Sequence, residues 1–210
     1  MQQTHEEAME YLRTAAVSER NLKFRQAVNA LDYRHITAED ANVLRDIYFK
    51  LKDMALRNQI LGCFMHLSNP ELGLGPFFQD AYKKERYLDM KLKAVRGLAN
   101  YATEPEIERT MKHFTKLLMK RPEHTPYNYQ EYEFLRSACG LPYLIKKYGY
   151  ACFEQAFMQE EQQYNDMPDA FKGHHTYDEV GNFIVLRSAE EVQKMLNKFF
   201  AAKRSNNESI

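Results

Sequence analysis

The stretch Asp53-Met54-Ala55-Leu56-Arg57 returns 36 residues later as Asp89-Met90-Lys91-Leu92-Lys93. Downstream of it, Ser68-Asn69-Pro70-Glu71-Leu72 returns 35 residues later as Thr103-Glu104-Pro105-Glu106-Ile107. A weaker third copy keeps Leu135-Arg136 and Gly140-Leu141, 43 residues after Leu92-Lys93 and Gly97-Leu98. A period of about 35–45 residues is typical of helical repeats, in which each helix pair buries an apolar face that only the next pair can cover. The sequence therefore predicts an all-α fold, a short α-solenoid of antiparallel helix pairs.

The rest of the chain has the same helical character. Only 8 Gly and 7 Pro interrupt its 210 residues, and apolar residues recur mostly at spacings of three and four, the period of a helix. Hydroxyl side chains stand three residues before an acid at five places, the pattern of a helix N-terminus. The five pairs are Thr4/Glu7, Thr37/Asp40, Ser68/Glu71, Thr103/Glu106 and Ser188/Glu191.

The last forty residues depart from the repeat. Residues 176–186 combine β-branched and aromatic side chains around Gly181-Asn182, a dipeptide that suits a two-residue hairpin turn. Ser188 then begins a final helix that ends in a polar, frayed tail from Lys203 to Ile210. We expect residues 1–170 to form the helical repeats and residues 171–210 to form a C-terminal hairpin and capping helix.

Composition excludes several classes of protein. Lys and Arg number 29, as do Asp and Glu, so no net charge attracts nucleic acid or an acidic membrane. No apolar run approaches the roughly 20 residues that span a bilayer, and the N-terminus lacks a secretory pattern. Three cysteines without metal-type spacing favour a reducing cytoplasm as the compartment.

Motifs for catalysis are absent from the sequence, which has no phosphate-binding glycine loop, zinc-protease helix or nucleophile elbow. His174 and His175, with Asp178, could seed a metal site, but adjacent residues of an extended chain point to opposite sides, so we expect a loop role without metal. Cys139 lies in an apolar segment and is expected in the core. We therefore expect a protein that is not an enzyme and that has no cofactor.

A row of basic residues is the most informative charge feature. Arg109, Lys112, Lys116 and Lys120 fall at spacings of three and four, so they share one face of a predicted helix, and Met111, Phe114 and Leu118 occupy the opposite face. The row is either a solvated outer face or a binding surface for an acidic protein or a phosphate backbone. The acids between residues 148 and 171 could neutralise it or form a second patch.

Tyrosines gather after this row. Half of the chain's 14 Tyr lie between residues 127 and 164, and Tyr is enriched where proteins bind proteins. Tyr127 and Tyr129 follow a proline-rich loop, so we place them at the surface. Packing in the core or loop is the alternative. The expected partner-binding residues are Arg109, Lys112, Lys116, Lys120, Tyr127 and Tyr129.

The repeat over residues 36–150 resembles HEAT-like repeats, whose second helix often opens with Asp, then an aliphatic and a basic residue, and then small residues and Leu. Asp53…Leu56-Arg57 and Asp89…Leu92-Lys93 follow this order, whereas Tyr132 replaces the Asp in the third copy. The resemblance implies a non-catalytic module that binds one dedicated protein. Bacterial immunity proteins of this kind mask a toxin, so a toxin domain is one candidate partner. The alternative is a nucleic-acid-binding protein or a DNA glycosylase-like enzyme on the same scaffold.

Overall fold

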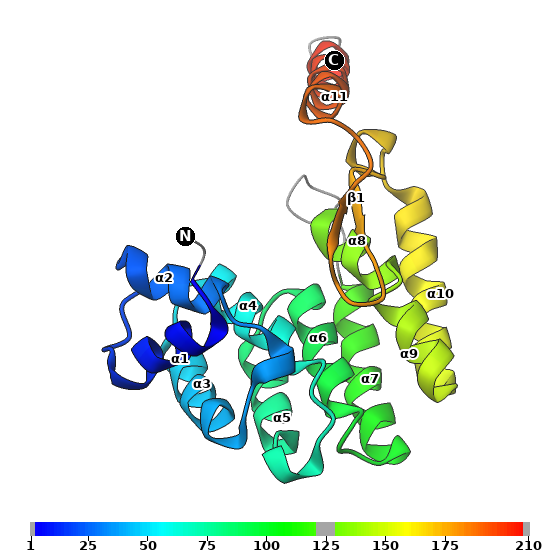
Figure 1. Cartoon of the computed structure of the whole chain (residues 1–210). Helices are drawn as coiled ribbons and strands as arrows, with labels where there is room; N and C mark the ends of the chain where they lie inside the picture. The colour runs from blue at the N-terminus through cyan, green and yellow to red at the C-terminus, as the bar shows by residue number, and fades with distance from the viewer. Residues whose placement is uncertain (1–2, 121–128, 208–210) are drawn as a thin grey trace. The chain divides into compact units, whose positions relative to one another are not determined.

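The structure, a computed structural model, describes residues 3–120 and 129–207. It is 70% helical with one small antiparallel hairpin, which confirms the predicted all-α class (Figure 1). The α-helices are α1 (His5–Thr14), α2 (Leu22–Asn29), α3 (Ala38–Lys50), α4 (Met54–Phe64), α5 (Gly75–Lys84), α6 (Leu88–Leu98), α7 (Glu104–Met119), α8 (Tyr129–Arg136), α9 (Leu141–Tyr148), α10 (Ala151–Asp166) and α11 (Ala189–Asn207). The 3-10 turns are η1 (Tyr33–His35), η2 (Pro70–Leu72) and η3 (Asp169–Phe171), and the strands are β1 (His175–Tyr177) and β2 (Phe183–Val185).

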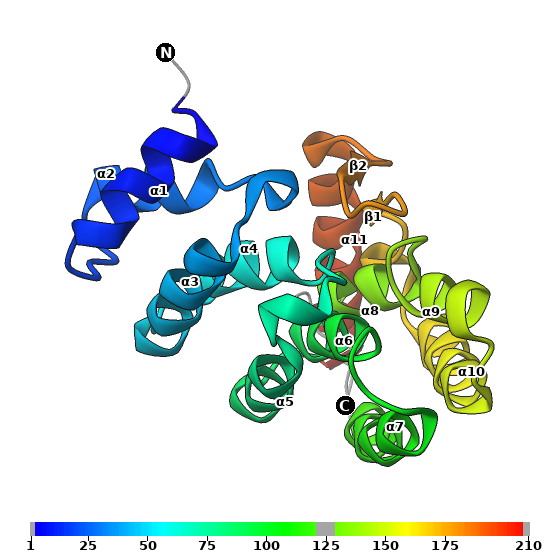
Figure 2. The same ribbon diagram turned by 60° about the horizontal axis from the view of Figure 1, so that its bottom comes forward.

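The chain forms two compact units. Unit 1 comprises Met1–Arg86 and Lys93–Ile107, and unit 2 comprises Tyr87–Leu92 and Glu108–Ile210. In unit 1, α1 packs on α2 and α3, and α4 packs on α2 and α3. In unit 2, α10 packs on α8 and α9, and α8 packs on β1; α9 and α10 lie side by side in both views (Figure 2). Contacts between a helix and the second helix after it are what stacked helix pairs produce.

Four of the five predicted helix N-termini carry the expected polar cap. Thr4 and Thr37 form capping boxes with Glu7 and Asp40. The Thr103 backbone N–H donates to the Glu106 carboxylate at 2.8 Å, and α7 begins at the next residue. Ser188 and Glu191 exchange two such bonds at the start of α11. Each box satisfies backbone N–H groups that the helix leaves unpaired.

The fifth predicted start, at Ser68, is wrong. Asn69 is the capping residue there, since its side chain accepts from the Glu71 N–H at 3.0 Å, and the segment it caps is the single turn η2. Gly73 follows with a left-handed φ of 56°, which ends the turn before a helix can continue. The next helix, α5, begins at Gly75.

The repeated leucines are buried as the repeat predicts. Leu56, Leu92 and Leu135 are at most 1% exposed. The basic residue after each leucine makes a polar contact with another segment: Arg57 with Glu85, Lys93 with Asn58 and Arg136 with Glu161. The same order occurs once more in α2, where buried Phe24 precedes Arg25, and Arg25 pairs with Asp53 at 2.6 Å.

A buried carboxylate joins three helices of unit 1. Glu85, at the end of α5, accepts hydrogen bonds from the Tyr48 hydroxyl at 2.6 Å and from Arg57 Nε at 2.6 Å. Arg57 Nη2 adds a second contact at 3.0 Å, so the guanidinium holds the carboxylate in a two-point geometry. The side chain of Glu85 is fully buried, and a carboxylate in that position requires such partners.

The hairpin lies where the sequence predicts it, but its turn differs. Tyr177 pairs with Phe183, so five residues connect the strands instead of the predicted two at Gly181-Asn182. The Asp178 carboxylate organises this loop by accepting from the N–H groups of Val180 and Asn182 at 3.0 and 2.8 Å. Gly181 adopts a φ of 92°, which a residue with a Cβ rarely adopts.

Gly97 of α6 packs closely against α5 in unit 1. A Cβ at this position would lie 2.1 Å from a ring carbon of Phe78 in α5, and that ring is fully buried. We predict that Gly97→Ala lowers the free energy of unfolding by about 1–3 kcal/mol, the usual cost of overpacking. Urea denaturation followed by circular dichroism measures it.

Gly62→Ala is the matched control, because nothing lies within 4 Å of a Cβ built at that helical position. Because alanine has a higher helix propensity than glycine, this substitution is expected to raise the free energy of unfolding by up to about 1 kcal/mol. Equal effects of the two substitutions would contradict the close contact between α5 and α6.

Candidate functional site

The basic row predicted from the sequence lies on the exposed face of α7. Its members Arg109, Lys112, Lys116 and Lys120 are all exposed, and Lys120 follows the last residue of the helix, Met119. The opposite face is buried, as predicted, and anchors α7 in the core. The buried residues are Ile107, Met111, Phe114 and Leu118. We call the four exposed cations the α7 stripe.

The α7 stripe lacks acidic partners in the described part of the chain. None of its four cations takes part in an ion pair with another described residue. Of the acids that could have neutralised it, Glu161 pairs with Arg136, Asp169 pairs with Lys172, and Glu160 has no exposure. Glu154 and Asp166 are exposed but form no ion pair with a stripe cation. Like charges at helical spacing repel by a few tenths of a kcal/mol per pair, so the stripe brings a small cost and no compensating ion pair.

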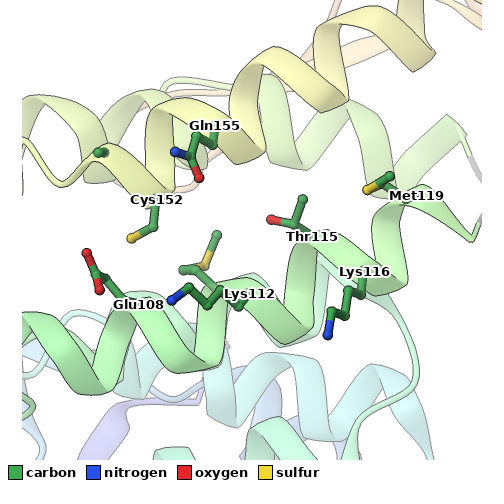
Figure 3. A pocket seen from close by; sticks show the side chains of 9 residues that line it. Glu108, Lys112, Thr115, Lys116, Met119, Cys152 and Gln155 are labelled. Atoms are coloured by element: carbon green, nitrogen blue, oxygen red, sulfur yellow. The ribbon is translucent and has the colours of Figure 1, made fainter.

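A hollow of about 320 Å³ lies between α7 and α10. Figure 3 shows Cys152 and Gln155 on α10 directed toward α7, opposite Glu108, Lys112 and Thr115. Two methionines of α7, Met111 and Met119, are among its apolar lining residues. The lining residues are Glu108, Met111, Lys112, Thr115, Lys116, Met119, Ala151, Cys152 and Gln155.

The chemistry of this hollow suits binding. Met119 is 60% exposed at its edge, and methionine adapts its shape to different apolar groups. The ammonium groups of Lys112 and Lys116 are donors without an acceptor among residues 3–120 and 129–207, and Gln155 adds an amide. The arrangement can therefore take up an apolar side chain with a carboxylate or phosphate beside it.

Tyr129 is not among the described residues that line the hollow. Tyr127 lies outside the described residues. Tyr129, the first residue of α8, is half-buried, with its ring centroid 4.7 Å from that of His174 and 5.9 Å from that of His175. The structure therefore brings Lys112 and Lys116 together around the hollow and packs Tyr129 on the histidine pair.

The histidine pair lies at the start of the hairpin, and His175 is the first residue of strand β1, not part of a loop. Both rings are buried, and Nε2 of His174 lies 2.8 Å from the Ala170 carbonyl oxygen. Burial lowers the pKa of both histidines, which keeps the rings neutral near pH 7. Residues 3–120 and 129–207 contain no group of three metal-type ligands.

A polar cluster in unit 2 ties α8, α10 and the start of the hairpin together. The Glu133 carboxylate accepts from the Tyr164 hydroxyl at 2.8 Å and from the Gly173 N–H at 2.6 Å. The Arg136 guanidinium lies over the Tyr164 ring, 3.6 Å from its centroid. Burial raises the pKa of Glu133. These contacts fix the chain where it leaves α10 for β1.

Glu160 is the residue that the sequence placed wrongly. It belongs to the run of acids expected on the surface, yet it is fully buried. Neither of its carboxyl oxygens has a hydrogen-bond partner among the described residues. Burial raises the pKa of Glu160 to about 8, so the protonated form prevails at neutral pH, since a buried charge without a partner is costly.

Comparison with known proteins gives no relative. No family model matches the chain, no curated protein matches it, and no solved structure matches it. In the described part of the chain, no helix is both long and apolar enough to cross a membrane.

We predict that Glu160→Gln stabilises the protein progressively as the pH rises. The folded carboxyl keeps its proton up to about pH 8, whereas the unfolded one releases it near the ordinary glutamate pKa of 4.5. The parent therefore loses stability between these two pH values, and the Gln variant does not. The difference in the free energy of unfolding between the variant and the parent should grow by up to about 4 kcal/mol from pH 5 to pH 8.5, in favour of the variant. Urea denaturation at constant ionic strength measures it.

Glu154→Gln, at an exposed position of the same helix, is the control and should show a constant difference from the parent. If Glu160→Gln changes the free energy of unfolding by the same amount at pH 5 and at pH 8.5, the side chain of Glu160 reaches water or a hydrogen-bond partner.

Proposed function

We propose that the protein is a non-catalytic module that binds one dedicated protein partner through unit 2. The proposed partner surface consists of the α7 stripe and the hollow between α7 and α10. The observation that carries the proposal is the absence of any ion pair to the four stripe cations within the described residues, in contrast to Arg25, Arg57 and Arg136, each of which has an acid.

The chemistry of this surface selects an acidic partner. Exposed cations in a row accelerate the encounter with an acidic surface, an effect that salt weakens. The hollow would hold an apolar or aromatic side chain of the partner, and a desolvated anchor of this kind usually supplies most of the binding energy. An acidic segment with one large apolar residue meets both requirements.

Tyr127 and Tyr129 remain a second proposed part of the partner surface. The ring of Tyr129 packs on His174 and the residue is half-buried, so only its exposed part could contact a partner. Replacing it would also disturb the packing around His174, which makes the stripe the cleaner place for a test.

The resemblance to HEAT-like repeats adds a candidate for the partner. Contacts between α1 and α3, between α2 and α4 and between α8 and α10 agree with stacked helix pairs and support a solenoid. Immunity proteins of that class bind a toxin, and a toxin domain with an acidic surface would fit the α7 stripe. The cytoplasm is the compartment in which such a protein would act.

Nucleic-acid binding is the second candidate, because an unpaired row of cations also suits a phosphate backbone. Zero net charge speaks against it. Fluorescence anisotropy with a random duplex in 50 mM salt separates the two candidates. Binding at micromolar concentration that falls steeply with added salt would favour nucleic acid, and its absence would exclude this candidate.

We predict that Lys112→Glu combined with Lys116→Glu abolishes partner capture. The tagged full chain is expressed in its native host, and the proteins retained with it are quantified by mass spectrometry. Reversing two charges beside the hollow should reduce recovery of the specific partner at least tenfold by repelling its acids, with little change in the melting temperature.

Lys50→Glu combined with Lys52→Glu is the matched control, since both lysines are exposed and lie in unit 1. It makes the same change in net charge and should leave the recovered partner unchanged. Equal losses for both pairs would mean a general charge effect, and no loss for the Lys112 and Lys116 pair would place the binding site elsewhere.

A further inference from the structure

The helix α11 has an apolar face that the described chain covers only in part. It contains 19 residues, which corresponds to a length of about 28 Å. Val192, Met195, Leu196 and Phe199 lie at helical spacing on one side and are half-buried. Phe200, next to this side, is 40% exposed. An amphipathic helix of this length normally buries such a face against another element.

The main packing partner of α11 among the described elements is the short turn η3. Phe171 of η3 contacts the ring of Phe199, with centroids 5.0 Å apart, and lies 6.4 Å from that of Phe200. Arg187 reaches Met195 at 2.9 Å. These contacts hold one side of the helix at two points and leave Val192 and Leu196 partly in water.

The strand before α11 adds to this uncovered apolar surface. Phe183, Val185 and Leu186 are 59%, 64% and 55% exposed, and all three residues of β2 are exposed. Large apolar residues that are neighbours in the chain and exposed together are typical of an interaction surface.

The charges of α11 are separated along its axis. Glu190 and Glu191 lie in its first turn, whereas Lys203 and Arg204 lie near its end. Glu190 also pairs with Lys194 within the helix at 2.8 Å, so the excess positive charge lies in the second half, together with Lys198. The helix is therefore acidic where its dipole is positive and basic where its dipole is negative.

We propose that the apolar face of α11 binds the same face of a second copy of this chain, with the two helices antiparallel. A two-fold axis near Leu196 would place the acidic start of each helix beside the basic end of the other. The same symmetry would bring Met195 of each copy near Phe199 of the other copy. A symmetric contact requires such self-complementarity, and α11 has it in both charge and apolar pattern.

A parallel pair would set Glu190 and Glu191 beside their own copies and Lys203 and Arg204 beside theirs, so repulsion disfavours it. The exposed strand β2 lies next to α11 in the chain and would extend the contact. This surface is separate from the α7 stripe, so self-association and partner binding can be tested independently.

Sedimentation velocity of the full chain from 1 to 200 µM tests the proposal. The parent should show a concentration-dependent monomer–dimer equilibrium. Lys203→Glu combined with Arg204→Glu gives a helix with two acidic ends, and Glu190→Lys combined with Gln193→Lys gives one with two basic ends while keeping the Glu191 cap. Each variant alone should dimerise at least tenfold more weakly than the parent.

The decisive sample is a 1:1 mixture of the two variants, which should form a heterodimer because their charges are complementary. Leu196→Glu should give a monomer with unchanged helix content by circular dichroism. A parent that is monomeric at 200 µM, a mixture that does not associate, or a dimer that Leu196→Glu leaves intact would each overturn the proposal.

Discussion

The ion pair between Arg57 and Glu85 illustrates the constraint on which the helical packing depends: a charge inside the packing needs an opposite charge from another element. Glu85 has no exposure, and Arg57 and Tyr48 supply its donors. The pairs of Arg25 with Asp53 and of Arg136 with Glu161 repeat the arrangement at partly exposed positions. Each cation comes directly after a buried apolar residue. The packing of that residue therefore fixes the position of the cation, which forms an ion pair with an acid from another element.

The α7 stripe differs from these pairs, because its four cations are exposed and have no ion-pair partner among the described residues. Its cations stand on the exposed side of a helix whose other side is buried through Ile107, Met111, Phe114 and Leu118. The core therefore fixes the stripe in place without neutralising it. The hollow beside it, about 320 Å³ in volume, adds apolar surface to the charge. Together they form a surface suited to an acidic partner.

Most structural features that depend on residues close in sequence could be predicted from the sequence, whereas features that depend on residues far apart in the chain could not. Helix caps such as Thr37/Asp40 and the α7 stripe depend on spacings of three or four residues, so the sequence alone predicts them. The hollow requires Cys152 and Gln155 to face α7 across about forty residues of chain, and no local pattern indicates that. Glu160 stands in an acidic run that looks solvated, and its burial depends on the elements that pack against α10. At the hairpin, the side chain of Asp178 outweighs the preference of Gly181-Asn182 for a two-residue turn.

Lysine labelling tests most directly whether a partner occupies the α7 stripe. The full chain is acetylated briefly with a water-soluble ester, once in purified form and once in an extract of its native host, and the modification of each lysine is compared by mass spectrometry. The account predicts that modification of Lys112 and Lys116 falls severalfold in the extract while that of Lys50 and Lys52 does not change. Equal modification of all four lysines in both samples would contradict it.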